Sequence, residues 1–85
     1  MDSTIVGHTP RLPDSKSLGF AVAAGLEPRV AYSISETSRY SGIPADWLRN
    51  AISAGELFAK TRSGNVRGAR IPVEAMDEWM EKRSA

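Results

Sequence analysis

Apolar and polar positions alternate most clearly in the second part of the chain, beginning near residue 32. Ser33 and Glu36 form a Ser-x-x-Glu pair, which is typical of a helix start because each side chain binds a backbone N–H group of the other residue. Tyr32, just before this pair, is expected to act as a hydrophobic staple. The pattern predicts a first helix over about residues 34–41, followed by Gly42 as a left-handed C-terminal cap.

A second helix is predicted from about Pro44 or Ala45 to Ala54, because proline suits the start of a helix and Gly55 suits the position after its end. At about 100° per residue, the apolar residues share one side of this helix; they are Ala45, Leu48, Ala51 and Ile52. The polar residues share the opposite side; they are Asp46, Arg49, Asn50 and Ser53. Trp47 falls on the flank. One side is therefore expected in a core and the other at the surface.

A hairpin and a last helix are predicted after the second helix. Residues 57–62 and 67–71 have the composition of two strands, and the Ser-Gly-Asn sequence of residues 63–65 supplies a turn between them. After Pro72, a helix is predicted to run to about residue 82, because apolar residues recur there at helical spacing. Its inner face is expected to consist of the apolar residues Val73, Met76, Trp79 and Met80, and its outer face to hold the acidic residues of the segment.

The first 30 residues are predicted to form an arm, either flexible or engaged with a neighbouring copy, and residues 31–85 the folded body. Prolines and glycines interrupt this arm too often for a long regular element. Residues 17–26 can form a short helix or an extended piece. The apolar side chains of Leu18, Phe20 and Val22 are expected to pack either on the chain's own body or on a second copy.

Composition excludes several classes of function. The 85 residues suffice for one small domain, and 25% charged with 41% hydrophobic residues is typical of a soluble protein. The chain has no cysteine and one histidine, His8, so neither a catalytic triad nor a metal site is expected. No apolar run approaches the roughly 18 residues of a membrane helix. We therefore expect no enzyme, no cofactor, no metal and no membrane partner.

Charge is unevenly distributed although the net charge is only +1. Residues 60–70 contain four basic residues and no acid, whereas residues 74–81 contain four acidic residues and no base. The basic residues are Lys60, Arg62, Arg67 and Arg70; the acidic ones are Glu74, Asp77, Glu78 and Glu81. Because a basic segment attracts anions, the predicted hairpin is a candidate for contact with nucleic acid.

Two short helices, a tight turn and a basic hairpin are together typical of a domain that binds duplex DNA. The major groove admits one helix, in which Arg49 can bind a guanine and Asn50 an adenine. Ser53 can reach a base or a phosphate. The hairpin would form a wing, whose basic residues, with Asn65 at its turn, contact phosphates or the adjacent minor groove. Arg39, outward on the first helix, is a further candidate for a phosphate contact.

Residues 32–82 resemble the excisionase and MerR-like winged-helix DNA-binding family. The resemblance is carried by an ordered set of segments: residues 32–36, Gly42 with Ile43, Trp47 with Leu48, residues 52–57, Arg70 with Ile71, and Met76 with Trp79. It implies an α+β fold, a small winged helix-turn-helix, with the N-terminal arm in addition. The partner it implies is double-stranded DNA.

The sequence departs from the family pattern at three places. Thr37, Ser38 and Ser41 replace the usual alanine and leucine, which puts tight packing of the first helix in question. Pro44 stands where a serine or threonine cap is usual. Asp46 places an acid near the phosphates, which is unfavourable unless it accepts from a cytosine or pairs with a neighbouring arginine.

The resemblance also implies a mode of action. Excisionases do no chemistry themselves; they bind adjacent DNA sites, contact one another and bend the DNA, so that a phage integrase assembles for excision. Here the arm, or the acidic last helix against a neighbour's wing, would link copies head to tail. The expected location is the cytoplasm of a bacterial host, at the nucleoid.

Two alternatives remain open at the level of sequence. One is a small MerR-like transcription regulator, although that type usually carries a long coiled coil after the domain, and this sequence stops at Ala85. The other is a winged-helix adaptor that binds proteins rather than DNA. The polar side of the second helix and the acid-free hairpin favour DNA over the adaptor.

Overall fold

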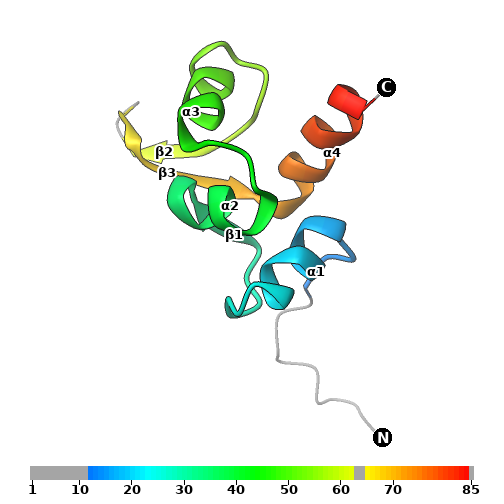
Figure 1. Cartoon of the computed structure of the whole chain (residues 1–85). Coiled ribbons are helices and arrows are strands. Elements are labelled where there is room, and N and C mark those ends of the chain that lie inside the picture. The colour runs from blue at the N-terminus through cyan, green and yellow to red at the C-terminus, as the bar shows by residue number, and fades with distance from the viewer. Residues whose placement is uncertain (1–11, 63–64, 85) are drawn as a thin grey trace, which may run out of the picture.

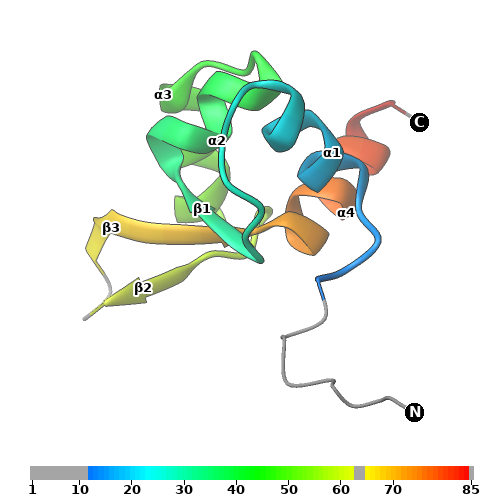
Figure 2. The ribbon, with the colours of Figure 1, turned by 90° about the horizontal axis from the view of Figure 1, so that it is seen from below.

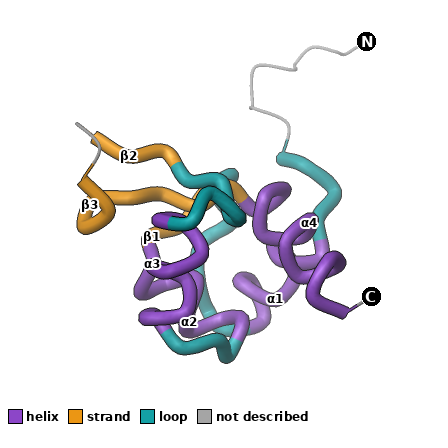
Figure 3. Tube along the Cα trace, turned by 90° about the horizontal axis from the view of Figure 1, so that it is seen from above, coloured by secondary structure: helices purple, strands orange, loops and turns teal. Residues whose placement is uncertain are grey.

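The computed structural model describes residues 12–62 and 65–84, and for residues 62, 65–67 and 84 it describes the backbone alone. The order of elements is α1 (Lys16–Ala23), β1 (Ala31–Ser33), α2 (Ile34–Ser41), α3 (Ala45–Ser53), β2 (Lys60–Arg62), β3 (Asn65–Pro72) and α4 (Val73–Ser84) (Figure 1). In Figure 2, α2 and α3 lie on one side of the sheet. Figure 3 shows β2 and β3 projecting beyond the helices as a wing. The fold is therefore an α+β winged helix-turn-helix, as predicted.

The sheet is antiparallel with the strand order β1-β3-β2. Its first strand was not predicted: Tyr32, expected as a staple, pairs with Ile71 in β1 and is fully buried. The first strand of the hairpin is also shorter than expected, since only residues 60–62 form β2. Leu57 lies before β2 in an irregular segment, and its side chain is buried in the hydrophobic core.

The helix starts and ends follow the local signals. The Glu36 N–H donates to the Ser33 hydroxyl, the Ser33 N–H donates to the Glu36 carboxylate, and both distances are 3.1 Å. This confirms the predicted capping box of α2. Gly42 ends the helix with φ +77°, in the left-handed region that favours glycine.

The turn between α2 and α3 explains two of the three unusual polar residues of α2. The Ser38 hydroxyl donates to the Ile43 carbonyl at 2.6 Å, and the Ser41 hydroxyl donates to the Thr37 carbonyl at 2.6 Å. The Ile43 N–H in turn donates to the Ser41 hydroxyl at 3.2 Å. The Ser38 and Ser41 hydroxyls thus satisfy the backbone C=O and N–H of Ile43 in the turn, which alanine and leucine would leave to water, so both serines stabilise the turn.

The core lies between the sheet and the helices and uses the predicted apolar faces. In α3, Leu48 and Ala51 are buried, while Ala45 and Ile52 are partly buried against them. In α4, the four residues expected on its inner face line the core, three of them buried and Met80 partly so. The helical spacing therefore predicted both faces correctly.

Helix α1 lies in the segment expected as an arm and packs on α2 and α4. Ser17 and Ala21 are fully buried, and Leu18 packs against the core. Phe20 and Val22 remain about half exposed, at 49% and 48%. Of the apolar residues in question, Leu18 thus packs within the chain, whereas Phe20 and Val22 present apolar surface.

Asp77 fastens α1 to α4, which corrects its expected place on the outer acidic face. Its carboxylate accepts from the Ser15 hydroxyl at 2.5 Å and from the Ser17 N–H at 2.8 Å. Partial burial acts to raise the pKa of Asp77, but these hydrogen bonds outweigh it and lower the pKa. Sequence spacing placed Asp77 outward because it contained no information on where α1 lies.

A small polar cluster is buried where α1 meets α2. The hydroxyls of Ser17, Thr37 and Tyr40 are buried and lack a hydrogen-bond partner among the described residues. Burial raises the pKa of Tyr40, and the nearby Ser17 and Thr37 hydroxyls only partly oppose this. Thr37 is fully buried, so α2 packs tightly despite this polar residue.

Candidate nucleic-acid interface

The polar side of α3 lies at the surface, as its spacing predicted. Asp46, Arg49, Asn50 and Ser53 are all exposed. The cause is local, because Leu48 and Ala51 hold the opposite side of the helix in the core. The helix thus presents a guanidinium, a carboxamide, a hydroxyl and a carboxylate together, which are groups that can hydrogen-bond base edges in a major groove.

Arg49 and Asp46 form an ion pair one turn apart on this surface. The distance between the Arg49 Nη2 and the Asp46 Oδ1 is 2.7 Å. Because both side chains are exposed, the pair adds little to stability. Its consequence is orientation: the carboxylate occupies one edge of the guanidinium and leaves other N–H groups to face outward. Of the two arrangements that would make Asp46 acceptable near DNA, the pairing with an arginine is present.

The start of α3 lacks a side-chain cap, as the departure at Pro44 suggested. Pro44 is the N-cap residue, and the N–H groups of Trp47 and Leu48 donate to its carbonyl at 3.0 and 3.3 Å. Proline replaces the usual hydroxyl by a fixed backbone angle, which still directs the chain into the helix. The start of the helix therefore presents backbone rather than a capping side chain.

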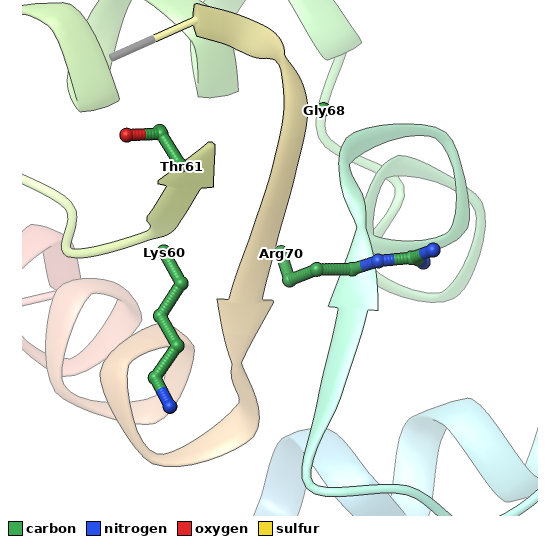
Figure 4. A pocket seen from close by; sticks show the side chains of 4 residues that line it. All are labelled: Lys60, Thr61, Gly68 and Arg70. Atoms are coloured by element: carbon green, nitrogen blue, oxygen red, sulfur yellow. The ribbon is translucent and has the colours of Figure 1, made fainter. Parts of the chain in front are cut away.

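Lys60 and Arg70 are paired in register across the two wing strands, β2 and β3. Ala69 and Ile71, on either side of Arg70, are buried, so strand alternation places Arg70 on the sheet face away from the core. Figure 4 shows the two basic side chains pointing apart, with that of Arg70 extending across β1. With Thr61 and Gly68 they line a shallow hollow. Arg70 therefore lies on the sheet face that the helices leave uncovered, and Lys60 points away from it.

Arg70 also has an acidic neighbour. Its Nη1 lies 3.7 Å from Oε1 of Glu36, whose other oxygen pairs with Arg29 at 3.2 Å. Hydrogen bonding from the Ser33 backbone lowers the pKa of Glu36; partial burial opposes this, and Arg29 reinforces it. The charge of Arg70 is consequently shared with a carboxylate, whereas Lys60 has no ion pair among the described side chains.

The remaining residues predicted to contact DNA belong neither to the polar side of α3 nor to the Lys60–Arg70 pair as the structure describes them. Arg39 is exposed on α2. Arg62, Asn65 and Arg67 have their backbones in the wing strands, but their side chains lie outside the described residues, as does His8. Their contacts with DNA stay predictions.

One basic residue beside α3 was missed by sequence reasoning. The guanidinium of Arg83 lies between two indole rings, with its central carbon 5.3 Å from the ring centre of Trp47 and 4.9 Å from that of Trp79. The i,i+4 spacing of Trp79 and Arg83 on α4 was a signal for half of this stack. The contact between Arg83 and Trp47 depends on how α4 packs against α3, and residue spacing within one helix cannot predict that packing.

The described residues provide little for other chemistry. They contain no group of three or more acidic or histidine residues placed to hold a metal ion. None of the described helices combines the length and the apolar character needed to cross a bilayer.

An exposed polar side on the second helix of a helix-turn-helix, followed by a two-stranded wing, is typical of a DNA-binding class of protein. Comparison with known families agrees: a family model described as a helix-turn-helix domain matches residues 31–84. The match spans more than half of the chain, so the chain belongs to the helix-turn-helix domain family, which is typically non-enzymatic. No curated protein and no solved structure matches it.

Proposed function

We propose that this protein is a sequence-specific, DNA-bending excisionase that directs a phage integrase towards excision by binding adjacent sites cooperatively. The observation that carries the DNA-binding part is the outward side of α3. There Arg49, oriented by Asp46 at 2.7 Å, lies next to Asn50 on an exposed helix. Arginine and asparagine are the side chains that bind guanine and adenine with paired hydrogen bonds.

The other candidates supply positioning contacts in this proposal. Ser53 reaches a base or a phosphate from the last turn of α3. Lys60, Arg62, Arg67 and Arg70, with Asn65, contact the backbone or the minor groove from the wing, and Arg39 contacts it from α2. If the four basic wing residues each met a phosphate, log affinity would fall with log salt with a slope of about −3.6.

Two features support assembly of several copies on DNA. Helix α4 exposes Glu74, Glu78 and Glu81, which can meet the basic wing of a neighbouring copy. Helix α1 exposes Phe20 and Val22. A head-to-tail contact of this kind does not close, so copies would follow the duplex as an open array. Bending 20–30 base pairs costs about 1–6 kcal/mol, which several cooperating copies can offset.

The excision role itself is supported by the resemblance of residues 32–82 to excisionases. In this role the protein would act at the nucleoid of a bacterial host, with a phage integrase as its protein partner. A MerR-like regulator would use the same α3 surface, and an adaptor would not need it. The three functions differ in how many copies bind, whether DNA bends, and whether DNA binds at all.

A gel-shift titration combined with a circular-permutation bending assay tests the proposal. The probe is the DNA that flanks the neighbouring integrase attachment site, and the variants are Arg49→Ala and Arg67→Ala. Lys16→Ala is the matched control, because Lys16 is an exposed basic residue on α1, which packs on the α2 and α4 sides.

Stepwise cooperative shifts with a growing bend, lost in both variants and kept in the control, are the expected result. A single shift without a bend would replace the excisionase by an operator-binding regulator. Absence of any shift at low salt would overturn DNA binding and leave the adaptor function.

A further inference from the structure

The C-terminal turn of α4 carries a cation held between two aromatic rings beside the recognition helix. The central carbon of the Arg83 guanidinium is 4.9 Å from the Trp79 ring centre and 5.3 Å from that of Trp47. Trp79 is only 5% exposed and so provides a fixed wall, whereas Trp47 is 53% exposed in the first turn of α3. The stack joins the end of α4 to the start of α3 across the surface of the protein.

The chemistry of this stack suits an anion with several oxygens. Arg83 is exposed, and its guanidinium forms no hydrogen bond or ion pair with the other described side chains. The central carbon of the guanidinium lies within about 6 Å of both ring centres, and its N–H groups remain available to a ligand. That planar fork matches the oxygens of a phosphate, and stacking reduces the side-chain freedom that binding would otherwise remove.

The position of the stack points to the DNA backbone as the source of that phosphate. At 100° per residue, Trp47 and Asn50 lie only about 60° apart around α3, so the stack borders the base-contacting side. A helix in the major groove, which is about 12 Å wide, is flanked by the phosphates that form the groove walls. A guanidinium on the flank of α3 therefore faces the position of a phosphate rather than a base.

We propose that Arg83 is a phosphodiester-binding residue, oriented by Trp47 and Trp79, that anchors DNA at the start of α3. This inference rests on the proposed DNA binding by α3 and adds to it a contact outside the helix-turn-helix and the wing. A stack that only clamps α4 to α3 would have a different signature. It would affect stability, and affinity through stability, but not the number of counterions released on binding.

The test measures DNA affinity between 50 and 300 mM salt by gel shift, together with thermal unfolding, for the full-length chain. Arg83→Gln removes the charge, Arg83→Lys keeps it without the planar fork, and Lys82→Gln removes a charge from the neighbouring exposed residue as a control. Losing one phosphate contact should reduce the salt slope by about 0.9 and weaken binding about eightfold near 0.1 M salt.

The expected pattern is a shallower slope for Arg83→Gln, most of the slope restored in Arg83→Lys, and little change in Lys82→Gln. An unchanged slope in Arg83→Gln, with any loss of affinity matched by a lower melting temperature, would overturn the proposal and leave a clamp. If Arg83→Gln does not fold, Arg83→Met takes its place, because an unbranched, uncharged side chain can still pack on the two rings; the proposal expects the same shallower slope from it, and an unchanged slope would overturn the proposal. Failure of the unaltered protein to bind DNA would instead overturn the proposed function, and this contact with it.

Discussion

Arg49 is positioned before any DNA arrives, because Asp46 holds one edge of its guanidinium at 2.7 Å. In an exposed pair this contact adds at most about 1 kcal/mol to stability. Its value lies in orientation, since an arginine that is already directed outward loses less freedom when it binds a base. Asp46, which is unfavourable near phosphates by its charge alone, thus orients the neighbouring Arg49.

Replacing Arg49 by alanine should lower affinity for the target site by about 1–3 kcal/mol, or roughly 5- to 150-fold, through loss of a bidentate contact to guanine. The measurement compares the variant and the unaltered protein on the target and on DNA in which each guanine of the site is changed in turn. The variant should lose discrimination at one guanine. An equal loss on every sequence would instead identify Arg49 as a phosphate contact.

At the scale of elements, short polar contacts decide where helices begin and how they meet. The reciprocal bonds of Ser33 and Glu36 start α2 directly at the end of β1, so the strand leads into the helix without a loop. Asp77 makes a similar contact between two elements, because its carboxylate on α4 accepts hydrogen bonds from Ser15 and Ser17 at the start of α1. Both contacts stabilise the frame that supports α3 without touching its outer side.

Changing Ser33 to alanine should therefore destabilise the fold by about 1 kcal/mol, because an N–H group at the start of α2 loses its acceptor. Chemical unfolding in urea measures this, with Ser35→Ala as the control, since Ser35 is exposed in the same helix. DNA affinity measured well below the melting temperature should stay the same. A comparable loss in Ser35→Ala would mean that the cap is not the cause.

Asp77 should make stability depend on pH. Its pKa lies below the ordinary 3.8, so the ionised carboxylate stabilises the fold above that value, and the stabilisation is lost as the pH falls through the lower, folded-state pKa. Asp77→Asn should cost about 1–2 kcal/mol at pH 7, and the difference from the unaltered protein should shrink below about pH 4. Thermal unfolding from pH 2.5 to 7 measures this.

Glu78→Gln is the control for the pH experiment, because Glu78 is exposed on the same helix. A difference between Asp77→Asn and the unaltered protein that stays constant down to pH 2.5 would show that the carboxylate does not need its charge to hold α1.

For the whole molecule, α1 is part of the packed body although it precedes the matched family segment. It covers α2 and α4 and buries Ser17 and Ala21 completely. A body of some 55 residues buries only about 60% of the surface of its unfolded chain, so the added apolar contacts of α1 form a substantial fraction of the stability.

Deleting residues 1–26 should therefore lower the free energy of unfolding by about 2–4 kcal/mol, from the loss of Ala21 and the partly buried Leu18 and Leu26. Urea unfolding of the truncated chain measures this, and Phe20→Ser in the full chain is the control, because Phe20 is half exposed. An unchanged stability of the truncated chain would mean that α1 is only loosely attached.

Local patterns determined much of this protein. The capping box, the glycine after α2, the two sides of α3 and the inner face of α4 were all predictable, because each depends on residues within one or two turns of one another. The same holds for the exposed polar residues of α3, whose outward direction follows from the burial of Leu48 and Ala51.

Only the tertiary structure decided how the elements combine. Strand β1, the attachment of Asp77 to α1, the stack around Arg83 and the contact of Arg70 with Glu36 all join residues far apart in the chain. Helical or strand spacing assigns a side chain to a face of its own element. Which neighbour meets that face depends on the packing of the whole core, which no local pattern contains.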